Sequence, residues 1–123
     1  MKGPRSILYD RAQDFFDLEG NYVMTLTPQA ALDVCQSLIE KNLVALMIEG
    51  GIWRNPGLEP RLDCIWNARP KNLSTSEGIN ITNKQAYKFI KEEHRLGHDV
   101  FILTVEDIDI AIETYVKNGD EFM

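Results

Sequence analysis

The two histidines of this 123-residue chain have the spacing of metal ligands on one face of a helix. His94 and His98 lie four residues apart, but Gly97 between them is typical of a helix C-terminus and would break that shared face. No cysteine or acidic pattern close by in the sequence completes a zinc motif. We therefore expect a polar helix end here, where cationic histidine is stabilised, and neither a metal nor a cofactor.

Cys64 is the candidate for nucleophilic chemistry, with Asp63 beside it. It alternates with Leu62 and Trp66 along a predicted strand, so the three should share a buried face. A buried thiol in apolar surroundings is unreactive, and Cys35 also occupies an apolar position. We therefore expect two free, buried thiols in a reducing cytoplasm.

Two weaker signals for catalysis remain. Glu49, Asp63 and His98 could perform acid–base chemistry if the fold brought them together, so a small α/β enzyme stays open as an alternative. Gly50-Gly51 lacks the lysine and hydroxyl residue of a phosphate-binding loop, and we expect a bend or bulge that ends a strand there.

The net charge of −6 is concentrated near the C-terminus. Residues 106–123 contain six acidic residues and one lysine, for a net charge of −5. Such a surface repels nucleic-acid phosphates and attracts basic partners, so we expect no nucleic-acid binding.

The acidic residues belong to a last helix that we expect to begin at a Thr104 cap. Helical spacing gives it a core face, made of Ile108, Ala111, Ile112 and Tyr115. The opposite face is acidic and has an apolar residue at its edge; these candidate partner-binding residues are Glu106, Asp109, Ile110, Glu113 and Asp120. The alternative is a solvated helix face whose first acids complement the helix dipole.

A second candidate surface is the predicted loop from Ile52 to Pro60, which contains Trp53, Arg54 and Glu59. Tryptophan and arginine are enriched among interface hot spots. Trp53 could equally close the end of the sheet.

The elements that must position these residues alternate between helix and strand. Strands are expected near residues 7–9, 22–26, 43–49, 61–66 and 100–103, with Phe15, Phe16 and Leu18 anchoring the N-terminal segment. Helices are expected from Thr27-Pro28 to about Lys41, with Ala31, Leu32, Cys35, Leu38 and Ile39 facing the core, and from Thr82 to Gly97. Residues 67–81 read as a loop. The pattern predicts one α/β domain, a sandwich with a mixed sheet of about four or five strands covered by about three main helices.

Two segments, Ile48–Trp53 and Glu59–Trp66, together with the preceding Thr27-Pro28 helix, resemble the small acidic immunity proteins of bacterial toxin–immunity systems such as contact-dependent growth inhibition. The resemblance covers about the central third of the chain. It implies a non-catalytic protein that binds a cognate toxin domain, commonly a nuclease, in the cytoplasm of the producing cell. The toxin would be blocked by covering its active site or a neighbouring substrate surface.

The negative net charge of the chain is consistent with a nuclease partner. A nuclease needs a basic surface to hold phosphates, and an acidic inhibitor would associate with that surface rapidly. The expected partner is therefore a basic toxin domain. We expect no binding to a membrane, a small-molecule substrate or a nucleic acid. A regulatory adaptor without catalytic activity is a further alternative.

Overall fold

The computed structural model describes residues 7–18, 24–54 and 57–121, with side chains as far as Val116. Its strands form one mixed sheet in the order β1-β2-β5-β3-β4, with β1 parallel to β2 and the other pairs antiparallel. The strands are β1 (Leu8–Tyr9), β2 (Thr25–Leu26), β3 (Leu43–Trp53), β4 (Leu58–Asn67) and β5 (Val100–Asp107). The predicted α/β class with a mixed sheet is confirmed.

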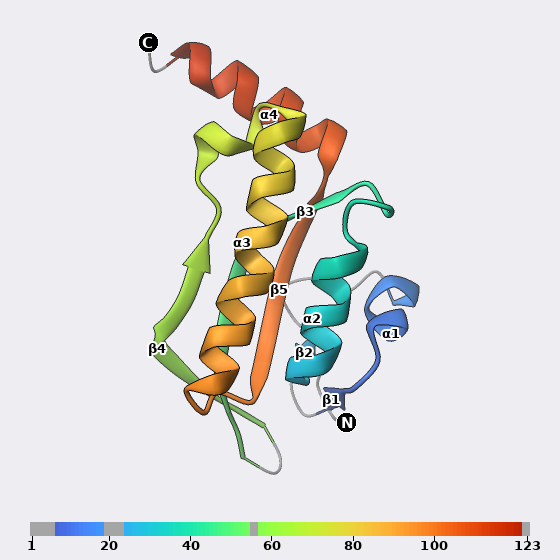
Figure 1. Cartoon of the computed structure of the whole chain (residues 1–123), viewed down its shortest axis with the longest axis vertical. Helices are drawn as coiled ribbons and strands as arrows, with labels where there is room; N and C mark the ends of the chain where they lie inside the picture. Colours follow the sequence, from blue (N-terminus) through green and yellow to red (C-terminus); the bar gives the residue numbers. More distant parts are fainter. Residues whose placement is uncertain (1–6, 19–23, 55–56, 122–123) are drawn as a thin grey trace.

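The helices are α1 (Ala12–Asp17), α2 (Pro28–Ser37), α3 (Ser76–Arg95) and α4 (Ile108–Glu121), with a short 3-10 helix η2 (Pro70–Leu73) before α3. α2 and α3 lie side by side over β5 and β3, α1 packs against α2, and α4 lies across one end of the sheet (Figure 1). No helix within the described residues combines the length and hydropathy needed to cross a membrane.

The main core fills the space between α2, α3 and the sheet. It includes Val34 and Cys35 from α2, Ile90 from α3, Ile48 from β3 and Phe101 from β5, all buried. A second core joins α4 to η2, the start of α3 and Val44 of β3. The predicted core face of the last helix is confirmed, since its residues belong to this second core: Ile108, Ala111, Ile112 and Tyr115.

Helix α2 begins as its sequence predicts. The Thr27 hydroxyl oxygen accepts a hydrogen bond from the Ala30 N–H at 3.2 Å, and Pro28 occupies the first turn. The helix ends at Ser37 rather than near Lys41, and Ile39 is exposed instead of facing the core. In the N-terminal segment, Phe15 and Phe16 pack on the core as expected, but Leu18 is exposed.

Helix α3 begins earlier than predicted. The Thr75 hydroxyl caps it by accepting from the Gly78 N–H at 3.0 Å, so the last part of the predicted loop, residues 76–81, is helical. Thr82, the predicted start, lies inside the helix and donates its hydroxyl hydrogen to the Gly78 carbonyl at 2.8 Å. The predicted end at Gly97 is confirmed, since this residue has a φ of +107°.

The prediction that Thr104 caps the last helix is wrong. Thr104 pairs with Met47 inside β5, which continues to Asp107. Val105, Glu106 and Asp107 also pair with β3, and α4 begins only at Ile108. Glu106 is therefore a strand residue and not part of the acidic helix face.

Gly50 and Gly51 do not end β3, because the strand continues through them to Trp53. A Cβ on Gly50 would lie 2.3 Å from the Cys64 sulfur, and one on Gly51 would lie 2.2 Å from the Glu59 carbonyl oxygen. The two glycines therefore allow β3 and β4 to approach closely, and Trp53 belongs to a strand end rather than a loop.

Candidate functional site

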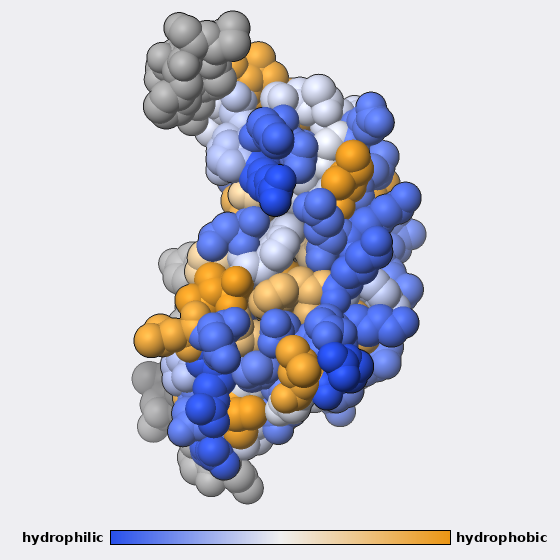
Figure 2. Space-filling view, turned by 60° about the vertical axis from the view of Figure 1, so that its left-hand side comes forward, coloured by the Kyte–Doolittle hydropathy of each residue, from blue (hydrophilic) through white to orange (hydrophobic). Residues whose placement is uncertain are grey.

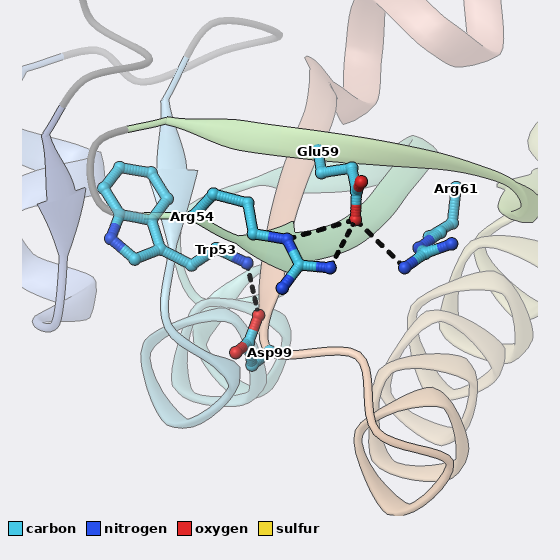
Figure 3. A network of polar contacts seen from close by, with 5 residues as sticks. All are labelled: Trp53, Arg54, Glu59, Arg61 and Asp99. Atoms are coloured by element: carbon cyan, nitrogen blue, oxygen red, sulfur yellow. Dashed lines mark hydrogen bonds and ion pairs between the residues drawn. The ribbon is translucent and has the colours of Figure 1, made fainter.

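The hairpin end of the sheet, where β3 passes into β4, brings together three of the predicted contact residues (Figure 3). Trp53 donates its backbone N–H to the Asp99 carboxylate at 2.7 Å. Arg54 donates to one oxygen of Glu59 at 3.0 and 3.3 Å, and Arg61 donates to the same oxygen at 3.0 Å. Trp53, Arg54 and Glu59 are among the predicted contact residues, whereas Arg61 and Asp99 are not: Arg61 follows Glu59 by two residues in β4, and Asp99 comes from the turn before β5.

The surroundings of Trp53 favour a surface role. Its backbone is fixed by pairing with Leu58 and by Asp99, while its side chain is only partly buried. Among the described residues, neither hydrophobic core includes Trp53. Part of the Trp53 side chain is therefore exposed to solvent.

Beside the hairpin, β4 departs from regular pairing with β3. Glu49 pairs with Ile65 and Gly51 with Pro60, so the four residues from Arg61 to Cys64 lie opposite the single residue Gly50. Regular alternation does not hold through such a bulge. Cys64 is buried as predicted, but Leu62 is 91% exposed, so its predicted place on the buried face is wrong.

Figure 2 shows the side of the molecule that carries β4. Its hydrophobic residues form small, separate patches among hydrophilic ones, and the outline is indented between the α4 end and the hairpin end. Leu62 and Ile65 are the exposed large hydrophobic residues of β4. A partner on this side would meet isolated apolar anchors within a polar surface, as is usual for non-obligate interfaces.

The acidic residues near α4 have structural contacts of their own. Asp107 precedes the helix, and its carboxylate accepts from the N–H groups of Asp109 and Ile110 at 2.9 and 3.2 Å. Asn42, with a φ of +59°, donates its amide to Asp107 at 3.1 Å and to Asp109 at 3.2 Å. Asp107 therefore caps the start of α4, and Asp109 in the first turn is held by Asn42.

The rest of the predicted acidic face is only partly described. Glu113 and Ile110 are exposed, Ile110 by 52%. Glu106 is partly buried in β5 and accepts from the Asp107 N–H at 2.9 Å. Asp120 lies beyond the side chains that the structure describes.

The two predicted contact surfaces lie at opposite ends of β3 (Figure 1). β3 is 11 residues long, from Leu43 beside α4 to Trp53 in the hairpin. At a rise of about 3.3 Å per residue the ends are roughly 30 Å apart. An interface of ordinary size, about 800 Å² per partner, is also about 30 Å across. A single partner could therefore contact both surfaces only at the edges of its interface.

The alternative acid–base site does not assemble. Ile48 and Trp66 pair and pack in the main core beside Cys64, so Glu49 and its partner Ile65 project from the opposite face of the sheet. His98 lies on the core side, where its ring contacts Glu93. The groove of about 350 Å³ between α2 and α3 is lined by other residues: Cys35, Gln36, Ile39, Asn80, Asn83, Lys84, Tyr87 and Lys88.

The thiols also lack the features of nucleophiles. Burial raises the pKa of Cys35 to about 12, and burial with the nearby carboxylates of Glu93 and Asp63 raises the pKa of Cys64 to about 12. Both cysteines are free and buried, as predicted. At neutral pH they are protonated and unreactive.

The relatives of the chain are bacterial immunity proteins. It is 42% identical over 102 residues to the immunity protein CdiI of Burkholderia pseudomallei, an alignment that covers 81% of this chain and 90% of that protein. It is 34% identical over 83 residues to the colicin-E5 immunity protein of Escherichia coli, and 33% identical over 84 residues to the colicin-E5 immunity protein in ColE9 of the same species. Each of these two alignments covers 68% of this chain and 99% of the relative.

These relatives place the chain in the class of toxin–immunity proteins, which confirms the resemblance seen in the sequence. Residues 24–106 match the Colicin-E5 Imm protein family, and the chain belongs to this family. The matched residues include β2, α2, β3, β4, α3 and nearly all of β5. α4 lies outside them, whereas the whole hairpin end lies inside.

Proposed function

We propose that this protein binds a cognate toxin domain and neutralises it by covering the surface that the toxin needs for its substrate. Membership of an immunity-protein family is the observation that carries the proposal. The action is binding without catalysis, in the cytoplasm of the cell that makes the toxin. The separation of Glu49 from His98 supports a binding protein over the alternative enzyme.

We place the main toxin contact at the hairpin end, on Trp53, Arg54, Glu59 and the bulge residue Leu62. Two observations support this position. The hairpin lies within residues 24–106, and the colicin-E5 immunity proteins align over almost their whole length with a stretch about as long as that match. The surface also combines a partly exposed tryptophan with arginines, residue types that are enriched among hot spots, and it has an exposed leucine beside them.

The acidic surface near α4 then has a second role. Asp109, Ile110, Glu113 and Asp120 follow the family match, and the charge of the three acids would speed the approach of a basic toxin rather than form the centre of the contact. We propose that the toxin is a nuclease, because its phosphate-binding surface would be basic.

The test uses the toxin domain encoded beside this gene, made inactive by substitution of its catalytic residue. Wild-type protein should bind it with nanomolar affinity, and co-expression should protect cells from the active domain. If the purified protein neither binds the toxin domain nor protects cells, the proposed function is wrong.

The position of the contact is tested by Leu62→Asp and Trp53→Ala. Each should weaken binding at least tenfold, mainly through faster dissociation. Ile39→Asp is the matched control, since Ile39 is an exposed apolar residue at the end of α2 and should leave affinity unchanged. If Leu62→Asp and Trp53→Ala bind like the wild type, the hairpin is not the contact.

The role of the acidic surface is tested by reversing Asp109 and Glu113 to lysine. Association should slow several-fold at low salt and differ little from wild type at high salt. A variant with Asp17 and Glu40 reversed, both exposed, controls for net charge. Equal association rates for the two variants would mean that the acidic surface near α4 has no specific role in association.

A further inference from the structure

Three side chains with metal-binding atoms meet beneath the bulge of β4. Cys64 comes from the bulge itself, Glu93 from the last turns of α3, and His98 from the turn between α3 and β5. The thiol sulfur, a carboxylate oxygen and a ring nitrogen all lie within 4.8 Å of one another. Within this cluster, His98 Nδ1 lies 3.0 Å from Glu93 Oε2.

This cluster is turned inward and held by backbone contacts. Cys64 is fully buried, and the side chains of Glu93 and His98 are 17% and 13% exposed. The His98 N–H donates to the Glu93 carbonyl at 3.0 Å, after the left-handed turn at Gly97 ends the helix. Gly50 allows the sulfur to sit against β3, because a Cβ there would lie 2.3 Å from it. The three groups are thus brought together by the fold rather than by mobile surface side chains.

A thiolate, an imidazole and a carboxylate form a ligand set that zinc prefers. Bonds of about 2.0–2.3 Å in a tetrahedral site place ligand atoms roughly 3.3–3.8 Å apart. The observed separations, 3.0 Å for the histidine–glutamate pair and at most 4.8 Å for the other two pairs, lie on either side of that spacing. Three protein ligands leave the fourth position for water or for a group of a binding partner.

We propose that Cys64, Glu93 and His98 form a zinc site that ties the bulge of β4 to the end of α3. On binding, the thiol releases its proton to solvent and the sulfur bonds to the ion as thiolate. The ion would hold Leu62, two residues before Cys64, in its exposed position. The competing arrangement is a set of hydrogen bonds without metal, in which the thiol and the imidazole both contact the Glu93 carboxylate.

Metal binding is measured on the full-length protein after chelation and removal of the chelator. Titration with Co²⁺ alone should give a sulfur-to-cobalt charge-transfer band and the visible bands of tetrahedral cobalt, saturating at one ion per chain. Zn²⁺ should displace the cobalt and raise the melting temperature of the chelated protein. Absence of the charge-transfer band would overturn the site.

The chain supplies matched controls. His98→Ala and Glu93→Gln should each weaken Zn²⁺ binding at least tenfold and reduce the thermal shift. Both variants keep the buried thiol of Cys64. His94→Ala and Cys35→Ser change the other histidine and the other buried thiol, and should bind Zn²⁺ like the wild type. If His98→Ala and Glu93→Gln keep full affinity, or if His94→Ala and Cys35→Ser lose it, the ion is bound elsewhere and the proposal is wrong. These readouts do not use the toxin, so they are independent of the proposed function.

Discussion

The hairpin end and the α4 end of the sheet are held by different kinds of contact. At the hairpin, β3 and β4 approach each other closely at Gly50 and Gly51, and backbone atoms provide most of the fixed geometry. At the other end, side chains fix the geometry, because Asp107 and Asn42 form the hydrogen bonds at the start of α4. The exposed side chains of the hairpin are therefore free to meet a partner, whereas several acids near α4 also stabilise the fold.

If close strand approach fixes the hairpin end, the largest loss of stability is expected from substitution of Gly51. Gly51→Ala would place a Cβ 2.2 Å from the Glu59 carbonyl oxygen, a backbone atom that cannot move without separating the two strands. We expect a loss of about 3 kcal/mol in the free energy of unfolding, measured by urea denaturation. Gly97→Ala is the control, because a Cβ there meets no atom within 4 Å and only the positive φ is unfavourable. Equal losses for the two variants would mean that close strand approach does not hold the hairpin.

At the α4 end the effect should be smaller. Asp107→Ala removes the acceptor for two N–H groups of the first turn, and we expect a loss of about 1 kcal/mol in the free energy of unfolding. Glu113→Ala, an exposed position later in the same helix, should change it by less than about 0.5 kcal/mol. If both acids matter equally, general charge rather than capping stabilises this end.

The smallest effect on stability is expected for Arg54→Ala. Arg54 and Glu59 form an exposed ion pair, so its loss should change the free energy of unfolding by less than about 0.5 kcal/mol. The same variant should weaken toxin binding about tenfold if the hairpin is the contact. Arg95→Ala breaks a similarly exposed pair with Glu92 and should affect neither quantity. A large stability loss for Arg54→Ala would show that this network supports the fold.

Local patterns in the sequence predicted much of the fold. The Thr27-Pro28 start of α2, the Gly97 end of α3 and the buried face of α4 depend on short-range spacing, and the structure confirms them. The start of α3 is predicted too late because Thr82 resembles a cap, while residues 75–80, mostly of polar or turn-forming types, form its true start. Thr104 was mistaken for a cap because pairing with Met47, a long-range contact, decides its state.

The candidate surfaces could be predicted less completely from the sequence than the fold. Residue type identified Trp53, Arg54 and Glu59, since their neighbours in the chain are also their neighbours in space. Leu62 was missed because strict alternation fails at a bulge that only the pairing with β3 reveals. The meeting of Cys64 with Glu93 and His98 is likewise a long-range result, since Cys64 is 29 residues away from Glu93 in the chain.

The bulge of β4 also bears on how this protein avoids self-association. β4 is an outer strand of the sheet, and a regular outer strand offers unpaired N–H and C=O groups to the strands of other molecules. Here Pro60 lacks an N–H, Arg61 and Asp63 add charge, and the extra residues break the spacing that a foreign strand would need. The same irregularity that exposes Leu62 therefore makes this edge a poor template for aggregation.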